Sequence, residues 1–152
     1  MPGIMQLTAE QFWQFGVEHY QRQGVKYACL SLQNHYQGNI NLALLLIYLD
    51  LHKAFLSEAH IQSLIAALEP SQSLLLPYRE MRKELKLQLK KAGYQQLLGF
   101  ELKLEQQQQA DLLRVLATFH LVCNDGDAAP NNLSYYCLQL GAQPLIQGLY
   151  GE

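Results

Sequence analysis

Residues 42–49 form the longest uninterrupted apolar run in the chain, with Asn41 before it and Asp50 after it. Eight residues are too few to cross a bilayer core of about 30 Å, which takes roughly 20 residues in a helix. The chain has only 4 Val, 6 Ile and 2 Thr against 31 Leu and 19 Gln, so the run is unlike a buried strand. A helix that is apolar all round belongs in the middle of a fold. We therefore expect an all-α protein with a central apolar helix over about residues 41–53.

Start and stop signals divide the chain into about six helices, and we expect them to form a single helical domain over residues 1–152. Thr8 and Gln11 have the spacing of a capping box at the start of the first helix. Asn39 is placed to cap the central helix, and Ser57 to begin the fourth.

The fifth and sixth helices are expected to form an antiparallel hairpin. Pro77 suits the first turn of a helix over about residues 77–92, and Gly93 separates it from the next, over about 94–123. Residues 124–132 are predicted to be a polar connector to a short C-terminal helix.

Two carboxylates, Glu101 and Glu105, fall at the centre of the apolar face of the sixth helix. A buried ionised carboxylate needs a partner. A hairpin that turns at Gly93 places Arg82 opposite Glu105 and Lys86 opposite Glu101, and we favour these ion pairs. Alternatively, the two carboxylates serve a pocket, as a general acid and a general base.

Neither a metal nor a cofactor is expected. None of the five histidines stands three residues after a glutamate, as the ligands of di-iron bundles do. Three cysteines without metal spacing, Cys29, Cys123 and Cys137, are interpreted as reduced, packed thiols.

The central helix carries a thin polar line made by Asn41, Tyr48 and His52. If that side faces the two glutamates, the group forms an interior polar site; otherwise Asn41 serves the helix start and His52 is exposed at the far end. The candidate residues for a polar site or buried ion pairs are Glu101, Glu105, Arg82, Lys86, Asn41 and Tyr48.

Six of the eleven cationic residues lie within residues 79–91, where two glutamates leave a net charge of +4. This stripe is either a solvated helix face or an anion-binding surface. Its candidate anion-binding residues are Arg79, Arg82, Lys83, Lys86 and Lys90. A formal net charge of -2 for the whole chain argues against nucleic-acid binding.

Several ordered segments resemble a family of small uncharacterised bacterial proteins catalogued as a domain of unknown function. The resemblance spans roughly residues 12–112. It rests on a helix start at 38–46 that reads GNINLALLL, on Pro77, Arg79, Arg82, Leu85 and Lys86, and on Glu101, Leu102 and Glu105. It implies a bacterial, cytoplasmic, helical protein without an assigned activity.

No catalytic motif is present, so we assign no catalytic residues. Residues 1–11 contain neither a basic residue nor an apolar run, and a cytoplasmic location is expected. We expect a non-enzymatic protein-interaction or regulatory module that binds another protein or a second copy of itself, and no membrane. The alternatives are a small-molecule-binding protein or enzyme with a site inside the bundle, and weak nucleic-acid or phosphate contact through residues 79–91.

Overall fold

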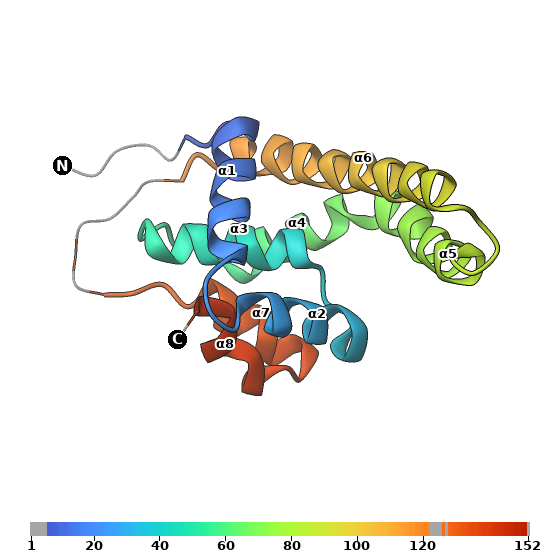
Figure 1. Cartoon of the computed structure of the whole chain (residues 1–152). Helices are drawn as coiled ribbons and strands as arrows, with labels where there is room; N and C mark the ends of the chain where they lie inside the picture. The colour runs from blue at the N-terminus through green and yellow to red at the C-terminus, as the bar shows by residue number, and fades with distance from the viewer. Residues whose placement is uncertain (1–5, 122–125, 127, 152) are drawn as a thin grey trace.

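The computed structural model describes residues 6–121, 126 and 128–151, and all the regular elements in these ranges are helices (Figure 1). The elements are α1 (Ala9–Tyr20), α2 (Val25–Tyr36), α3 (Ile40–Leu51), α4 (Glu58–Ala67), α5 (Glu69–Leu85), α6 (Lys91–Leu116), the 3-10 turn η1 (Ala117–Phe119), α7 (Asn132–Leu140), the 3-10 turn η2 (Gln143–Leu145) and α8 (Ile146–Tyr150). The all-α expectation is confirmed. The described ranges contain eight α-helices rather than about six, because the chain after residue 131 folds into more helical turns than its glycines and proline suggest.

Helix α3 occupies the centre of the fold, as the apolar run predicts. Nine of its twelve residues are buried, and it packs against α1, α2, α6 and α7. The Asn39 side chain accepts a hydrogen bond from the backbone N–H of Leu42 at 2.9 Å, so the predicted cap is confirmed. The helix ends at Leu51, two residues before the expected end.

The other two predicted helix starts are also confirmed. Thr8 and Gln11 form a complete capping box, with hydrogen bonds of 3.0 and 3.1 Å in the two directions. Ser57 caps α4, and the side chain of His60 returns the second bond of the box.

Helices α5 and α6 form the expected hairpin, but with different bounds. Figure 1 shows the two helices side by side, extending beyond the remaining helices. Helix α5 begins at Glu69, so Pro70 takes the position near the helix start and Pro77 lies inside the helix. The turn covers residues 86–90, because the Leu85 carbonyl accepts from the N–H groups of residues 88 and 89 and Lys90 adopts the extended backbone of a helix start. Gly93 therefore lies in the first turn of α6, not between the helices.

Helix α6 ends at Leu116, and the chain leaves it through η1 and a left-handed His120, before the expected end near residue 123. Residues 124, 125 and 127 of the predicted connector lie outside the described residues. The short C-terminal helix expected after the connector is α7. Across the described residues, no helix combines the length and apolar character needed to cross a bilayer.

Asp50, at the end of the central helix, anchors the C-terminal helices. Its carboxylate accepts hydrogen bonds from the backbone N–H groups of Asn132 and Leu133 at 2.9 and 3.1 Å, at the start of α7. The Tyr150 hydroxyl donates to the same carboxylate at 2.5 Å. One buried side chain thus satisfies the start of α7 and holds the end of α8.

Candidate functional site

Glu101 on α6 forms ion pairs with two arginines of α5. The residue is 8% exposed, and its carboxylate accepts from the guanidinium Nε of Arg79 at 3.3 Å. It also accepts from Nε and Nη2 of Arg82, whose Nη1 donates to the Tyr94 hydroxyl at 3.2 Å. Both arginines are largely buried, so Glu101 belongs to a compact three-residue ion cluster.

The two expected ion pairs, Arg82 with Glu105 and Lys86 with Glu101, are not formed. Arg82 meets Glu101 instead, and Lys86 Nζ lies 5.7 Å from the centre of the Tyr94 ring. The cause is the turn between the helices, which comes several residues earlier than expected and shifts the hairpin register by about one helical turn.

Glu105, one turn further along α6, has a different environment. No described residue gives its carboxylate a hydrogen bond or an ion pair. Burial raises the pKa of this carboxyl group; the charge of Arg79 lowers it, that of Glu101 raises it and that of Arg82 lowers it. Glu105 is therefore a half-buried acid without a protein partner among the described residues.

Glu105 lines a pocket of about 330 Å³ between α1, α3 and α6, which we call the Glu105 pocket. Apolar and aromatic side chains make most of its wall. The residues used below are Trp13, Tyr20, Asn41, Leu44, Glu105 and Gln109. Burial raises the pKa of the Tyr20 hydroxyl, and Cys29 and Glu105 raise it further, which places this hydroxyl in the electrostatic field of the glutamate.

Asn41, which the sequence singles out, is one of five amide side chains that hydrogen-bond to one another where α3, α5 and α6 meet. The others are Asn39, Gln72, Gln108 and Gln109. Gln108 Oε1 accepts from both asparagines at 3.1 Å, Gln108 Nε2 donates to Gln72 at 2.8 Å, and Gln109 donates to Asn41 at 3.0 Å. We call these residues the amide network. The polar groups of these neutral side chains are hydrogen-bonded to one another. The amides that line the Glu105 pocket therefore add no charge to it, and Glu105 is its charged residue.

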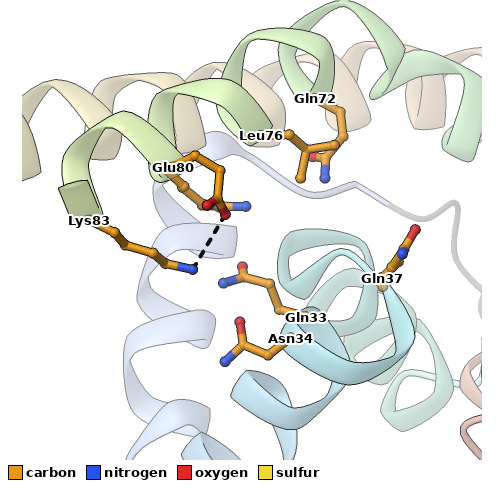
Figure 2. A pocket seen from close by; sticks show the side chains of 9 residues that line it. Gln33, Asn34, Gln37, Gln72, Leu76, Glu80 and Lys83 are labelled. Carbon is orange, nitrogen blue, oxygen red and sulfur yellow. Dashed lines mark ion pairs between the residues drawn. The ribbon is translucent and has the colours of Figure 1, made fainter.

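A second hollow of about 530 Å³ lies between α2 and α5, and we call it the α2–α5 cleft (Figure 2). Its wall is polar. Amide side chains and charged residues dominate it: Gln33, Asn34, Gln37, Gln72, Arg79, Glu80 and Lys83. The amide network separates this cleft from the Glu105 pocket, since Gln72 lines the first while Asn41 and Gln109 line the second.

Tyr48 is not brought to the two glutamates. Its ring stacks on His52, with ring centres 3.9 Å apart, and meets Phe15 edge-on at 5.2 Å. His52 is exposed at the end of α3, as the alternative interpretation of this polar line states. Of the three residues in that line, only Asn41 lines the Glu105 pocket.

The expected basic stripe divides into two groups. Arg79 and Arg82 form ion pairs with Glu101, whereas Lys83, Lys86 and Lys90 are exposed. Of the exposed lysines, Lys83 alone lines the α2–α5 cleft.

The glutamines of the amide network were not predicted from the sequence. Gln108 lies seven residues after Glu101 and four before Leu112, on the stripe that faces the core, and all three are buried. This helical spacing could have identified Gln108 as a buried polar residue. The partners Asn39 and Gln72 come from distant segments, and the spacing on α6 does not identify them.

The buried thiols are consistent with the structural interpretation of the cysteines. Cys29 and Cys137 are free and buried, and burial raises their pKa values to about 12 and about 11. Such thiols stay protonated at neutral pH. Cys123 lies outside the described residues. No group of three metal-ligating side chains comes together in the part of the chain that the structure describes.

The residues of both cavities lie in a region that matches a known protein family. The model of a family described as "Protein of unknown function (DUF2390)" matches residues 11–112. The match covers about two thirds of the chain and includes the residues that line the Glu105 pocket and the α2–α5 cleft. The chain belongs to this family, which confirms the resemblance to a domain of unknown function. No curated protein and no solved structure matches the chain.

Proposed function

We propose that this member of the DUF2390 family is a small-molecule-binding protein whose Glu105 pocket takes an organic cation. One observation carries the proposal. Glu101 has two arginines as partners, whereas Glu105 points to no partner in the described residues and lines a mostly apolar pocket. A ligand cation would supply the missing charge.

The wall of the pocket supports a cation with a hydrocarbon body. Trp13 and Tyr20 are among the lining residues, and aromatic rings attract a cation as well as apolar groups. Leu44 adds apolar surface, while Gln109 is engaged with Asn41. The volume of about 330 Å³ falls in the range of small-ligand pockets, about 300–1,000 Å³.

The proposal assigns binding and no chemical step. A pair of carboxylates that acts as general acid and base needs both groups at the substrate. Glu101 is held by Arg79 and Arg82, which leaves Glu105 as the single acid of the pocket. The proposal therefore follows the small-molecule-binding alternative of the sequence analysis, without its enzymatic form.

Phenethylamine is expected to bind the pocket and to change the fluorescence of Trp13, the single tryptophan of the chain. Phenethyl alcohol and 3-phenylpropionate carry the same ring with a neutral and a negative head group, and we expect both to bind at least about tenfold more weakly. Glu105→Gln should weaken phenethylamine binding about 10- to 100-fold, because it removes a charge-assisted hydrogen bond of about 1.5–3 kcal/mol.

Glu10→Gln is the matched control, because it makes the same chemical change at an exposed position outside the pocket. It should leave phenethylamine binding unchanged. Equal affinity for the three probes, or unchanged binding in Glu105→Gln, would contradict the proposal.

A second candidate function, the expected protein-interaction module, is favoured by the surface of the α5–α6 hairpin. Seven of the thirteen exposed large apolar residues of the described chain lie within residues 69–116. Leu87, at the turn, is 96% exposed, and the lysines near it are Lys83, Lys86, Lys90 and Lys91. An apolar tip with a basic surround complements a protein surface that is apolar and acidic.

Leu87→Asp is expected to abolish cross-linking of the protein to such a partner in lysate of the source organism, and the recovered partner should carry an acidic surface. Leu138→Asp is the control, because Leu138 is also exposed, at 61%, but lies on α7. Equal cross-linking in both variants would exclude the hairpin as the contact. Light scattering tests the other expected partner, a second copy of the chain. If the partner is a second copy, the wild type should be a dimer and Leu87→Asp should be a monomer.

A further inference from the structure

The guanidinium group of Arg79, in the wall of the α2–α5 cleft, uses one nitrogen for an ion pair and leaves two without a protein partner among the described residues. Its Nε donates to Glu101 at 3.3 Å, and no described residue accepts from its two terminal NH₂ groups. Every buried side-chain nitrogen and oxygen among the described residues has a hydrogen-bond partner, so these terminal groups are accessible to solvent, and Arg79 lines the cleft. The side chain is 11% exposed and is held by the ion pair. Arg79 therefore presents a pre-positioned pair of donors.

Gln72 adds a donor from the same wall. Its Oε1 accepts from Asn39 Nδ2 at 3.2 Å and from Gln108 Nε2 at 2.8 Å. With the oxygen turned to the amide network, the NH₂ group of Gln72 is left for the cleft, which Gln72 lines.

The opposite wall is made by α2. Figure 2 shows Gln33 and Asn34 extending from α2 toward Lys83 of α5. Lys83 Nζ is 3.8 Å from Glu80 Oε1, and both side chains are more than half exposed. An exposed pair of this kind contributes little, about 0–1 kcal/mol, so the ammonium group can turn to a ligand.

From these contacts we propose that the α2–α5 cleft is a second ligand site, which binds a small organic molecule through a carboxylate or phosphate group. The fork of an arginine side chain matches both oxyanions, and the amides suit the polar remainder of such a molecule. The charged residues that line the cleft are Arg79, Lys83 and Glu80, two cations against one carboxylate, and behind them Glu101 is shared by Arg79 and a second cation, Arg82. The cleft thus keeps a net positive charge, in contrast to the acidic Glu105 pocket.

The probes for this site are citrate and inorganic phosphate, each followed by ¹H–¹⁵N NMR of the full chain. We expect citrate or phosphate to shift the Arg79 Nε–H signal and the side-chain amides of Gln33, Asn34 and Gln72. Binding of one probe alone identifies the favoured oxyanion. Binding of neither overturns the proposal.

Three variants distinguish a specific binding site in the cleft from general attraction of anions to a basic surface. Arg79→Lys keeps the charge beside Glu101 but removes the fork, and should weaken binding about tenfold. Lys83→Gln, at an exposed position, should weaken it about threefold without affecting folding. Lys91→Gln is the matched control, because Lys91 is an exposed lysine of the same hairpin outside the cleft. A loss in Lys91→Gln as large as in Lys83→Gln, or shifts of equal size at Lys86 and Lys90, would overturn the proposal.

Discussion

Replacing Glu101 with glutamine is expected to lower the free energy of unfolding by about 3–5 kcal/mol, because it leaves two buried arginines without their shared carboxylate. The side chains of Arg79 and Arg82 are 11% and 16% exposed, so water compensates little for the loss. Urea unfolding at neutral pH measures the change, with the fluorescence of Trp13 as the signal.

Glu105→Gln is the matched comparison, one helical turn away. Glu105 has no ion pair in the described chain, and burial raises its pKa, so its ionised form opposes folding. This cost is absent below the ordinary pKa of a glutamate and complete above the raised pKa. We therefore expect Glu105→Gln to cause no loss of stability at pH 7. Its free energy of unfolding should increase relative to that of the wild type as pH rises from the ordinary pKa of glutamate to the raised pKa. A loss as large as that of Glu101→Gln would show that Glu105 is the paired carboxylate.

The second large effect is expected at Asp50. Asp50→Ala should lower the free energy of unfolding by about 2–4 kcal/mol, because it removes the acceptor for two N–H groups at the start of α7 and for the Tyr150 hydroxyl. Hydrogen exchange should also speed up in α7 and α8.

Tyr150→Phe removes a single one of these hydrogen bonds and should cost about 1 kcal/mol. If both variants lost the same amount, or if exchange in α7 stayed as slow as in the wild type, Asp50 would not be the anchor of the C-terminal helices.

Local signals in the sequence predicted much of the fold. The apolar run at residues 42–49 identified the central helix to within two residues at its end, because a helix without a polar face can only be buried. Thr8 and Ser57 identified helix starts, since a capping side chain bonds within its own first turn. These features depend on neighbours in the chain.

The hairpin register could not be predicted in the same way. Pro77 and Gly93 are strong signals for helix ends, yet both lie inside helices here. The turn forms at residues 86–90 through backbone hydrogen bonds that follow no single residue type. A shift of one helical turn then decides which glutamate meets Arg82. The sequence indicated that Glu101 and Glu105 were unusual, but tertiary packing decides which one is paired.

The walls of the Glu105 pocket were beyond prediction for a related reason. Trp13 and Tyr20 lie on an amphipathic helix whose partner helices are set by packing. Asn41 was identified, because a polar residue beside an apolar run is conspicuous, but the amides that hold it come from α6.

The pKa of Glu105, followed by NMR of its side-chain carboxyl carbon, tests the central claim that this acid is an unpaired receptor for a cation. In the free protein we expect a pKa above the ordinary value for glutamate, because burial disfavours the charged form. Saturation with phenethylamine should lower that pKa, since a bound cation favours the carboxylate. A pKa at or below the ordinary value in the free protein, or one that phenethylamine leaves unchanged, would contradict the account.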